Sequence, residues 1–398
     1  MGNISCLKNP ASRLIILLLA GIIIISCERE KEDRLPDPDY LIEYELLTEF
    51  STNEIINMIG GAGDLPTGIE LLVRYGVSVY RIVYETIDTE NNYIPASGAL
   101  ILPKTADPLP LMSFHHGTIT REEDAPSYFI SDQYMAAAFY SATGFIIALP
   151  DYLGYGTSRH LDHPYEHGRS LATASRDMLR AVREFDLRSD EFNISDKLFL
   201  TGYSQGGYTT MALLKLLEEE HLTEFSITAA TAGAGAYNKT LFAEYLVELD
   251  EELEYLNYFL WVLDTYNSVY SIDRPYSYYF NEPHATTIEQ YGVFANIEMN
   301  PRNLFTTQFI YGIITGDDTE FAEALADNDN YDWKPSTPLQ LYHGTDDDFV
   351  FYFNSSTAYE AMKARGSGSV ELITIEGGNH ATTITDYLLG TFLFFSSF

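Results

Sequence analysis

The chain has little cysteine and little positive charge, and its N-terminal apolar run is too short to cross a membrane comfortably. Its 398 residues include two cysteines, Cys6 and Cys27, and 23 lysines and arginines against 58 aspartates and glutamates. The formal net charge of −35 disfavours nucleic acid and other polyanions as partners. A hydrophobic content of 46% predicts a globular protein with a large core.

The N-terminal residues resemble an export signal. Lys8 and Arg13 precede a run of twelve apolar or glycine residues, Leu14 to Ile25, which has the length of a secretory apolar segment. The run leads into Ser26-Cys27, similar to the lipobox of bacterial lipoproteins. We therefore expect residues 1–26 to be a lipoprotein signal peptide and Cys27 to carry the lipid anchor. The mature chain then has one cysteine and no disulfide. An ordinary signal peptide with a chance cysteine is the alternative.

A tether is predicted over residues 27–50, because the stretch that begins at Glu28 is charged, contains proline and has little to bury. Its acidic character resembles the surface-export signals of Bacteroidetes lipoproteins, although a solvated linker has the same composition. The expectation is an exported lipoprotein of the outer membrane, exposed on the cell surface and attached to the membrane through its lipid.

The rest of the chain predicts an α/β fold with a mostly parallel, doubly wound sheet. Two alternating runs, 71–86 and 94–102, indicate an antiparallel hairpin at its N-terminal edge. Apolar strands then alternate with helices, and these strands are expected at 109–114, 145–149, 197–202, 226–232, 338–343 and 370–375. One connecting helix is expected over 171–185, with its apolar residues near one face.

A helical cap is predicted as an insertion into this sheet, because about a hundred residues separate the fourth and fifth of these strands. The predicted parts are a first part of the core at 51–236, the cap at 237–335 and a second part of the core at 336–398. Aromatic residues crowd the cap between Tyr255 and Phe280. We expect most of them to form the cap's own core, while some could line an acyl or aryl pocket.

The segment Gly202-Tyr203-Ser204-Gln205-Gly206 has the pattern of a nucleophile elbow. An apolar strand precedes it and a run of strong helix formers follows. Such a turn lifts a serine hydroxyl above a sheet, so the residues two before and two after the serine must be small. Ser204 is therefore the predicted nucleophile, and an ordinary glycine-rich loop is the alternative.

A serine nucleophile needs a histidine base and an acid, which in doubly wound hydrolases follow it in the order acid, then histidine. One later strand leads into Asp346, Asp347 and Asp348, and the next leads into His380. His380 is accordingly the predicted general base and acid. At this point the three aspartates remain open as its partner.

An oxyanion hole is predicted from backbone N–H groups at two strand ends. One is the N–H of Gln205, directly after the serine, and the other belongs to Thr118 or Gly117, after the first core strand. No metal site and no cofactor are expected: His115 and His116, and the histidines between 160 and 167, lack Cys or Glu partners at structural zinc spacing.

Several of these segments together are similar to the secretory lipase family of α/β-hydrolases. They are His116-Gly117-Thr118, Pro150 to Gly156 with His163-Pro164-Tyr165, Asp177 to Ala181, and Gly202 to Gly207. The resemblance spans about residues 100–235 and resumes over 338–380. It implies the α/β-hydrolase fold, carboxylic ester hydrolysis through an acyl-enzyme, and a cap whose residues match no motif that names the substrate.

The spacing His343-Gly-x-x-Asp347-x-x-Val350 also resembles related enzymes, and it selects Asp347 as the acid. The prediction is thus a serine esterase or lipase with the triad Ser204, Asp347 and His380, acting on a small-molecule or lipid ester. Two alternatives stay open. A serine peptidase on this fold would cleave aminoacyl-arylamides in preference to aryl esters. A non-catalytic glycan- or lipid-binding lipoprotein would bind its ligand without turnover.

Overall fold

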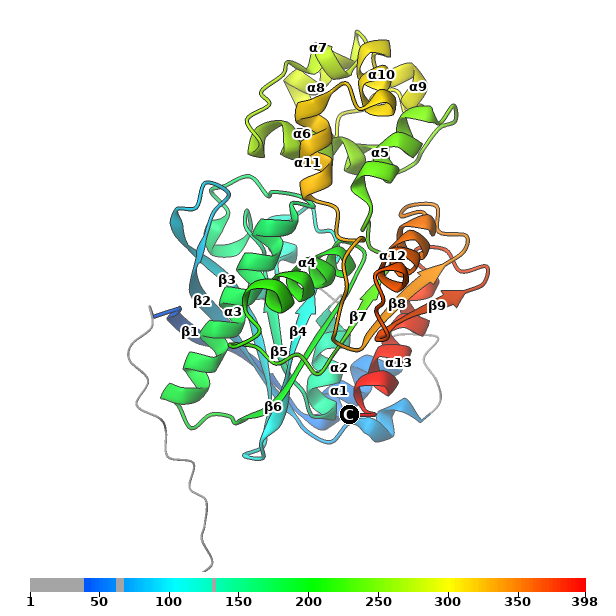
Figure 1. Ribbon diagram of the computed structural model, residues 1–398. Helices are drawn as coiled ribbons and strands as arrows, with labels where there is room; N and C mark the ends of the chain where they lie inside the picture. Colours follow the sequence, from blue (N-terminus) through cyan, green and yellow to red (C-terminus); the bar gives the residue numbers. More distant parts are fainter. Residues whose placement is uncertain (1–38, 62–67, 131–133) are drawn as a thin grey trace, which may run out of the picture. The chain divides into compact units, whose positions relative to one another are not determined.

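Nine strands form one sheet, in the order β1-β2-β3-β5-β4-β6-β7-β8-β9 (Figure 1), in a computed structural model that describes residues 39–61, 68–130 and 134–398. The strands are β1 (Leu41–Phe50), β2 (Val77–Ile87), β3 (Tyr93–Pro103), β4 (Leu109–His115), β5 (Ile146–Pro150), β6 (Ile194–Tyr203), β7 (Ala229–Gly233), β8 (Leu339–Gly344) and β9 (Val370–Ile375). The pairs from β1 to β5 along this order are antiparallel, and all later pairs are parallel. The predicted doubly wound sheet with an antiparallel N-terminal edge is therefore confirmed.

The tether predicted over residues 27–50 is wrong at its C-terminal end, because residues 41–50 form β1 and pair with β2. β1 is the edge strand and leaves most of its side chains exposed, including Glu43 and Glu45, so its composition resembles that of a linker. The run predicted as extended from residue 71 begins later, at Val77, because residues 69–72 form a short 3₁₀ helix. The predicted signal peptide, Cys27 and residues 28–38 lie outside the described residues.

Helices cover both faces of the sheet. On one face are α3 (Gly168–Arg188), α4 (Gln205–Glu220) and α12 (Phe353–Ala364), and on the other are α1 (Thr52–Gly61), α2 (Met135–Thr143) and α13 (Thr383–Phe395). Each layer shares a hydrophobic core with the sheet. The strand β6 and the helix α4, which flank Ser204, are thereby held in the middle of the fold.

A helical cap lies between β7 and β8. It comprises α5 (Lys239–Glu248), α6 (Leu256–Val269), α7 (Tyr276–Tyr279), α8 (His284–Tyr291), α9 (Pro301–Leu304), α10 (Thr307–Thr315) and α11 (Thr319–Asp327), and Figure 1 shows these helices together, beyond the carboxyl ends of the strands. Its own core includes Tyr266, Tyr279 and Phe280. As expected, most aromatic residues between 255 and 280 pack in this core.

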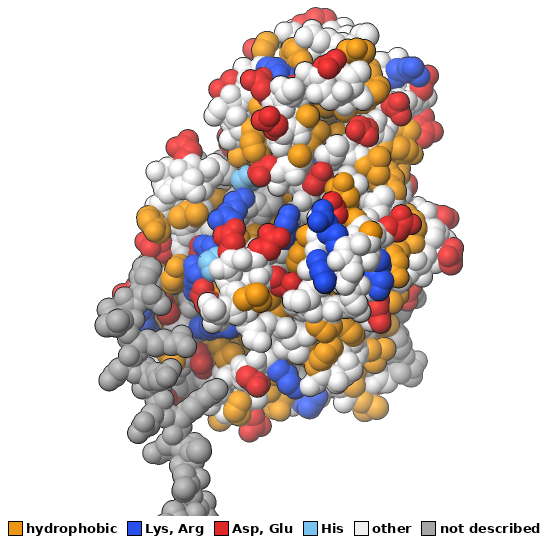
Figure 2. Space-filling view, in the orientation of Figure 1, with side chains coloured by type: hydrophobic (Ala, Val, Ile, Leu, Met, Phe, Trp, Pro, Cys, Tyr) orange, Lys and Arg blue, Asp and Glu red, His pale blue; other side chains and the backbone are white. Residues whose placement is uncertain are grey.

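Acidic side chains are scattered over both the cap and the core on the face that Figure 2 shows. Among the described residues, no helix is long and apolar enough to cross a bilayer.

Candidate active site

Ser204 occupies the turn between β6 and α4, with φ 59° and ψ −124°, a backbone conformation that non-glycine residues rarely adopt. Its N–H donates to the carbonyl oxygen of Gly233 at 2.8 Å. A Cβ on Gly202 would collide with the backbone of Gly206, and a Cβ on Gly206 would collide with the carbonyl of His115. The close approach of these backbones explains why both positions beside the serine are glycine.

His380 and Asp347 come to Ser204 from the ends of two later strands. His380 follows β9, and its Nε2 lies 2.9 Å from the Oγ of Ser204. Its Nδ1 lies 2.8 Å from Oδ2 of Asp347, which follows β8. The hydroxyl of Tyr203 donates to the backbone oxygen of His380 at 2.8 Å and ties this loop to β6. The structure thus brings the three predicted triad residues into one hydrogen-bonded chain.

Asp347 is buried and accepts hydrogen bonds on both carboxylate oxygens. Oδ1 accepts from the backbone N–H groups of Phe349 at 3.0 Å and Val350 at 2.8 Å. Burial by itself raises the pKa of Asp347, but hydrogen bonds from His343 and His380 outweigh it and lower the pKa to about 2. The carboxylate is therefore ionised at neutral pH, which leaves it only able to accept, so Nδ1 of His380 carries the proton.

His343 is the residue of this chain of contacts to which sequence reasoning assigned no role. Its Nε2 lies 3.2 Å from Oδ2 of Asp347, and its ring is fully buried. The carbonyl of Val350 and the hydroxyl of Ser355 hold the same ring from its two nitrogens. The motif from His343 to Val350, whose spacing selected Asp347, could have identified His343, because His343 is the first residue of that motif.

Asp346 and Asp348 are both exposed, and within the described residues neither hydrogen-bonds His380, whose Nδ1 faces Asp347. The structure thus brings only the middle aspartate of the three to the histidine.

Two of the predicted oxyanion donors, Gln205 and Gly117, lie beside Ser204. Gln205 is the first residue of α4, so its N–H has no intrahelical acceptor. Gly117 lies beside the nucleophile, since a Cβ built on it would be 3.8 Å from Cβ of Ser204. The hydroxyl of Thr118 hydrogen-bonds the hydroxyl of Tyr165 at 2.9 Å. The two backbone segments therefore flank the same hydroxyl.

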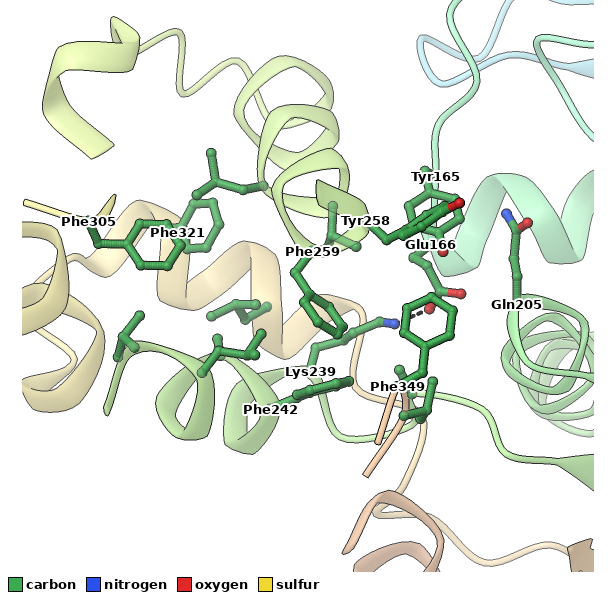
Figure 3. Close-up of a pocket in the computed structure, with 18 of the residues that line it drawn as sticks. Tyr165, Glu166, Gln205, Lys239, Phe242, Tyr258, Phe259, Phe305, Phe321 and Phe349 are labelled. Atoms are coloured by element: carbon green, nitrogen blue, oxygen red, sulfur yellow. Dashed lines mark hydrogen bonds and ion pairs between the residues drawn. The ribbon is translucent and has the colours of Figure 1, made fainter. Parts of the chain in front are cut away.

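An apolar pocket with about 790 Å³ of empty space, part of it open to solvent, leads from Ser204 into the cap (Figure 3). Its walls come from the core on the Ser204 side and from α5, α6, α10 and α11 of the cap. Phe349 joins the two sides, because its ring lies 5.0 Å from that of His380 and 5.3 Å from that of Tyr258. The lining residues are Tyr165, Glu166, Ser204, Gln205, Ala236, Lys239, Phe242, Ala243, Leu246, Val247, Tyr258, Phe259, Val262, Leu263, Phe305, Phe309, Phe321, Leu325, Phe349 and Val350.

One ion pair, Glu166 with Lys239, interrupts this apolar wall. Glu166 is 5% exposed and Lys239 is 4% exposed. The ammonium group also lies over the ring of Tyr208, 3.8 Å from its centroid. Burial raises the pKa of Glu166 and lowers that of Lys239, while each charge opposes the shift of the other. Sequence reasoning missed this pair, since its members are 73 residues apart and match no motif.

The histidines considered for a metal site are mostly buried. Burial lowers the pKa values of His115, His116, His163 and His167 to about 3, 4, 3 and 4, so these rings are neutral. His163 accepts a hydrogen bond from the side-chain amide of Gln205 at 2.8 Å and thereby fixes this residue. Within residues 39–61, 68–130 and 134–398, no three His, Cys, Asp or Glu side chains are arranged to hold a metal ion.

Comparisons with known proteins bear on the fold and on the class of reaction. The sequence pattern of the secretory lipase family matches residues 130–387. A solved structure of a Legionella pneumophila protein that is classed as a hydrolase is similar with a TM-score of 0.81 and 27% identity, over 90% of this chain and 98% of that one. The rice cell wall degrading esterase LipA from Xanthomonas oryzae has a TM-score of 0.75 and 24% identity, over 89% and 96%. Candida antarctica lipase A in its closed state has a TM-score of 0.61 and 16% identity, over 89% and 83%. None of the curated proteins matches the sequence.

Proposed function

Because this chain belongs to the secretory lipase family and is a carboxylic ester hydrolase, we propose that it cleaves its ester through an acyl-enzyme on Ser204. The observation that carries the proposal is the chain of two hydrogen bonds from Ser204 Oγ through His380 to Asp347, at 2.9 and 2.8 Å. A serine hydroxyl is a weak nucleophile at neutral pH, and such a chain is what activates it.

In the acylation step, Oγ of Ser204 attacks the ester carbonyl carbon while Nε2 of His380 takes the hydroxyl proton. The resulting imidazolium is stabilised by the ionised Asp347. His380 then gives the proton to the leaving alkoxide, which departs as the alcohol. In the second step, water attacks the acyl carbon, His380 again takes and returns the proton, and Ser204 is regenerated as the carboxylic acid leaves.

The backbone N–H groups of Gln205 and of Thr118 or Gly117 are the donors that stabilise the negative charge developing on the carbonyl oxygen. The dipole of α4 adds to this stabilisation, because its positive end lies at the first turn of the helix, where Gln205 is. Each such donor contributes roughly 2.7 to 4 kcal/mol to the stability of the transition state.

The apolar pocket supports an ester with an apolar acyl chain as the substrate. Phenylalanine and leucine side chains form most of the wall on the cap side of Ser204, as Figure 3 shows for Phe242, Phe305 and Phe321. Burying an alkyl chain there contributes about 0.8 kcal/mol per CH₂ group.

The test is labelling of the purified protein, residues 39–398, with a fluorophosphonate, which reacts with activated serines. We expect Ser204 to be labelled and Ser204→Ala to be unlabelled. Ser127→Ala, a change at a buried serine elsewhere in the core, is the matched control and should label as the wild type does. Equal labelling of Ser204→Ala, or a folded wild type that neither labels nor hydrolyses an aryl ester, would refute the proposal.

We also propose that the enzyme is exported and held at the outer membrane, facing the cell surface, by a lipid on Cys27. The support is the sequence pattern of residues 8–27. Expression of Cys27→Ser in a bacterial host should move the enzyme from the membrane fraction to the soluble fraction. An unchanged distribution would contradict the lipid anchor.

A further inference from the structure

Glu166 and Lys239 place a polar group in a pocket that otherwise favours alkyl chains. Figure 3 shows both residues in the wall of the pocket, which Ser204 also lines. Bringing two charges out of water is costly, and apolar side chains of similar size would often be at least as stable. Stability therefore does not explain this ion pair, and its position in the pocket beside Ser204 indicates a role in contacts with the substrate.

The carboxylate of Glu166 has one oxygen available to the pocket. Among the described residues, Lys239 is the donor to this carboxylate, and it bonds Oε2. Figure 3 shows the carboxylate on the side of the pocket that also holds Gln205. Within the described residues no donor bonds Oε1, so this oxygen is free to accept a hydrogen bond from a molecule in the pocket that Glu166 lines.

The position of Glu166 is also well defined. Its backbone has φ 57°, and its carbonyl oxygen accepts a hydrogen bond from the hydroxyl of Tyr266, on α6 of the cap, at 2.9 Å. Contacts from α5 and α6 therefore hold the residue from the cap, while its own loop leads into α3 of the core. A group held in this way can discriminate between substrates, because it does not reorient to accept a poor fit.

We propose that Oε1 of Glu166 accepts a hydrogen bond from a hydroxyl group of the ester substrate, so that Glu166 is a specificity-determining residue. The inference rests on the proposed hydrolysis at Ser204. A neutral hydroxyl fits better than an ammonium group, because the charge of Lys239 is adjacent. It also fits better than a carboxylate or phosphate, which Glu166 would repel.

The hydroxyl can belong to the acyl chain or to the alcohol, and two pairs of esters distinguish these sources. In the acyl pair, p-nitrophenyl butyrate is compared with the p-nitrophenyl ester of β-hydroxybutyrate. In the alcohol pair, ethyl butyrate is compared with hydroxyethyl butyrate. In one pair the wild type should prefer the hydroxylated ester in kcat/KM by roughly 10- to 100-fold, the range for a hydrogen bond to a charged group.

The double variant Glu166→Met/Lys239→Met replaces the pair with apolar side chains of similar length. Its preference, measured as the ratio of kcat/KM for the two esters of a pair, should fall to about 1. Arg169→Met/Glu220→Met removes a surface ion pair outside the pocket and should keep the full preference. Glu166→Gln serves as a second variant if the double variant does not fold, and its preference should also be reduced.

Hydrolysis of all four esters by the wild type without a hydroxyl preference would overturn this inference and leave the proposed function standing. A double variant that keeps the preference would overturn it as well. A wild type that hydrolyses none of the esters and does not react with fluorophosphonate would overturn the proposed function, and this inference with it.

Discussion

Asp347→Asn should inactivate the enzyme by reversing the proton arrangement on His380. The carbonyl oxygen of the new amide must take the place of Oδ1, because only an acceptor satisfies the N–H groups of Phe349 and Val350. The amide nitrogen then faces Nδ1 of His380 and donates to it. The proton of His380 therefore moves to Nε2, where it points at Ser204, and the base has no lone pair for the hydroxyl proton.

The expected loss is roughly 10⁴-fold in kcat, the cost of the wrong histidine tautomer in a serine hydrolase. This corresponds to about 5.4 kcal/mol in activation free energy. The unfolding free energy should fall by about 2 kcal/mol, because a carboxylate whose pKa is about 2 strongly favours its charged form over a neutral one. The assays are aryl ester hydrolysis at neutral pH and urea unfolding of the same preparations.

Asp346→Asn and Asp348→Asn are the matched controls, since both side chains are exposed. They should keep activity within a few-fold of wild type and stability within about 0.5 kcal/mol. Comparable losses in all three variants would refute the assignment of the acid. Substantial activity in a folded Asp347→Asn variant would refute the tautomer argument itself.

Two further predictions concern the fold around the site. Gly206→Ala should destabilise the protein by about 1 to 3 kcal/mol and abolish turnover, because its Cβ collides with the His115 carbonyl. The control is Gly60→Ala, in α1 with open space around it, which should be neutral or stabilising by up to about 1 kcal/mol. Both variants are measured by urea unfolding and by esterase assay, and equal effects of the two substitutions would contradict the packing argument. The unfolding free energy should also decline from pH 6.5 to about 4, since the unfolded chain protonates histidines that the fold keeps neutral, with pKa values near 3 to 4. Asp151, whose pKa burial raises to about 6, works in the opposite direction, as do Glu166, Asp264 and Asp329, whose pKa values burial also raises. His221, whose pKa burial lowers, adds to the decline, and a flat unfolding profile over this range would refute the reasoning.

Sequence patterns were reliable where the cause of the structure is local. The strands β5 and β7 are buried on both faces, so each is a short apolar run. The Gly-x-Ser-x-Gly turn follows from close backbone contacts at Gly202 and Gly206. β1 was missed because an exposed edge strand with glutamates has the composition of a linker. Secondary structure was hardest to predict where the side chains face solvent, because no buried face imposes an apolar pattern on such residues.

The sequence alone determined the fold class, the position of Ser204 on its turn and the order in which acid and histidine follow, because these depend on local periodicity and on strand ends meeting at one edge of a parallel sheet. The spacing from His343 to Val350 already selected Asp347 through its resemblance to related enzymes, and the tertiary structure decided the burial and the N–H contacts that hold its carboxylate against His380. It also decided that Glu166 and Lys239 meet in the wall of the pocket. Contacts of this kind join residues distant in sequence, and no local pattern encodes them.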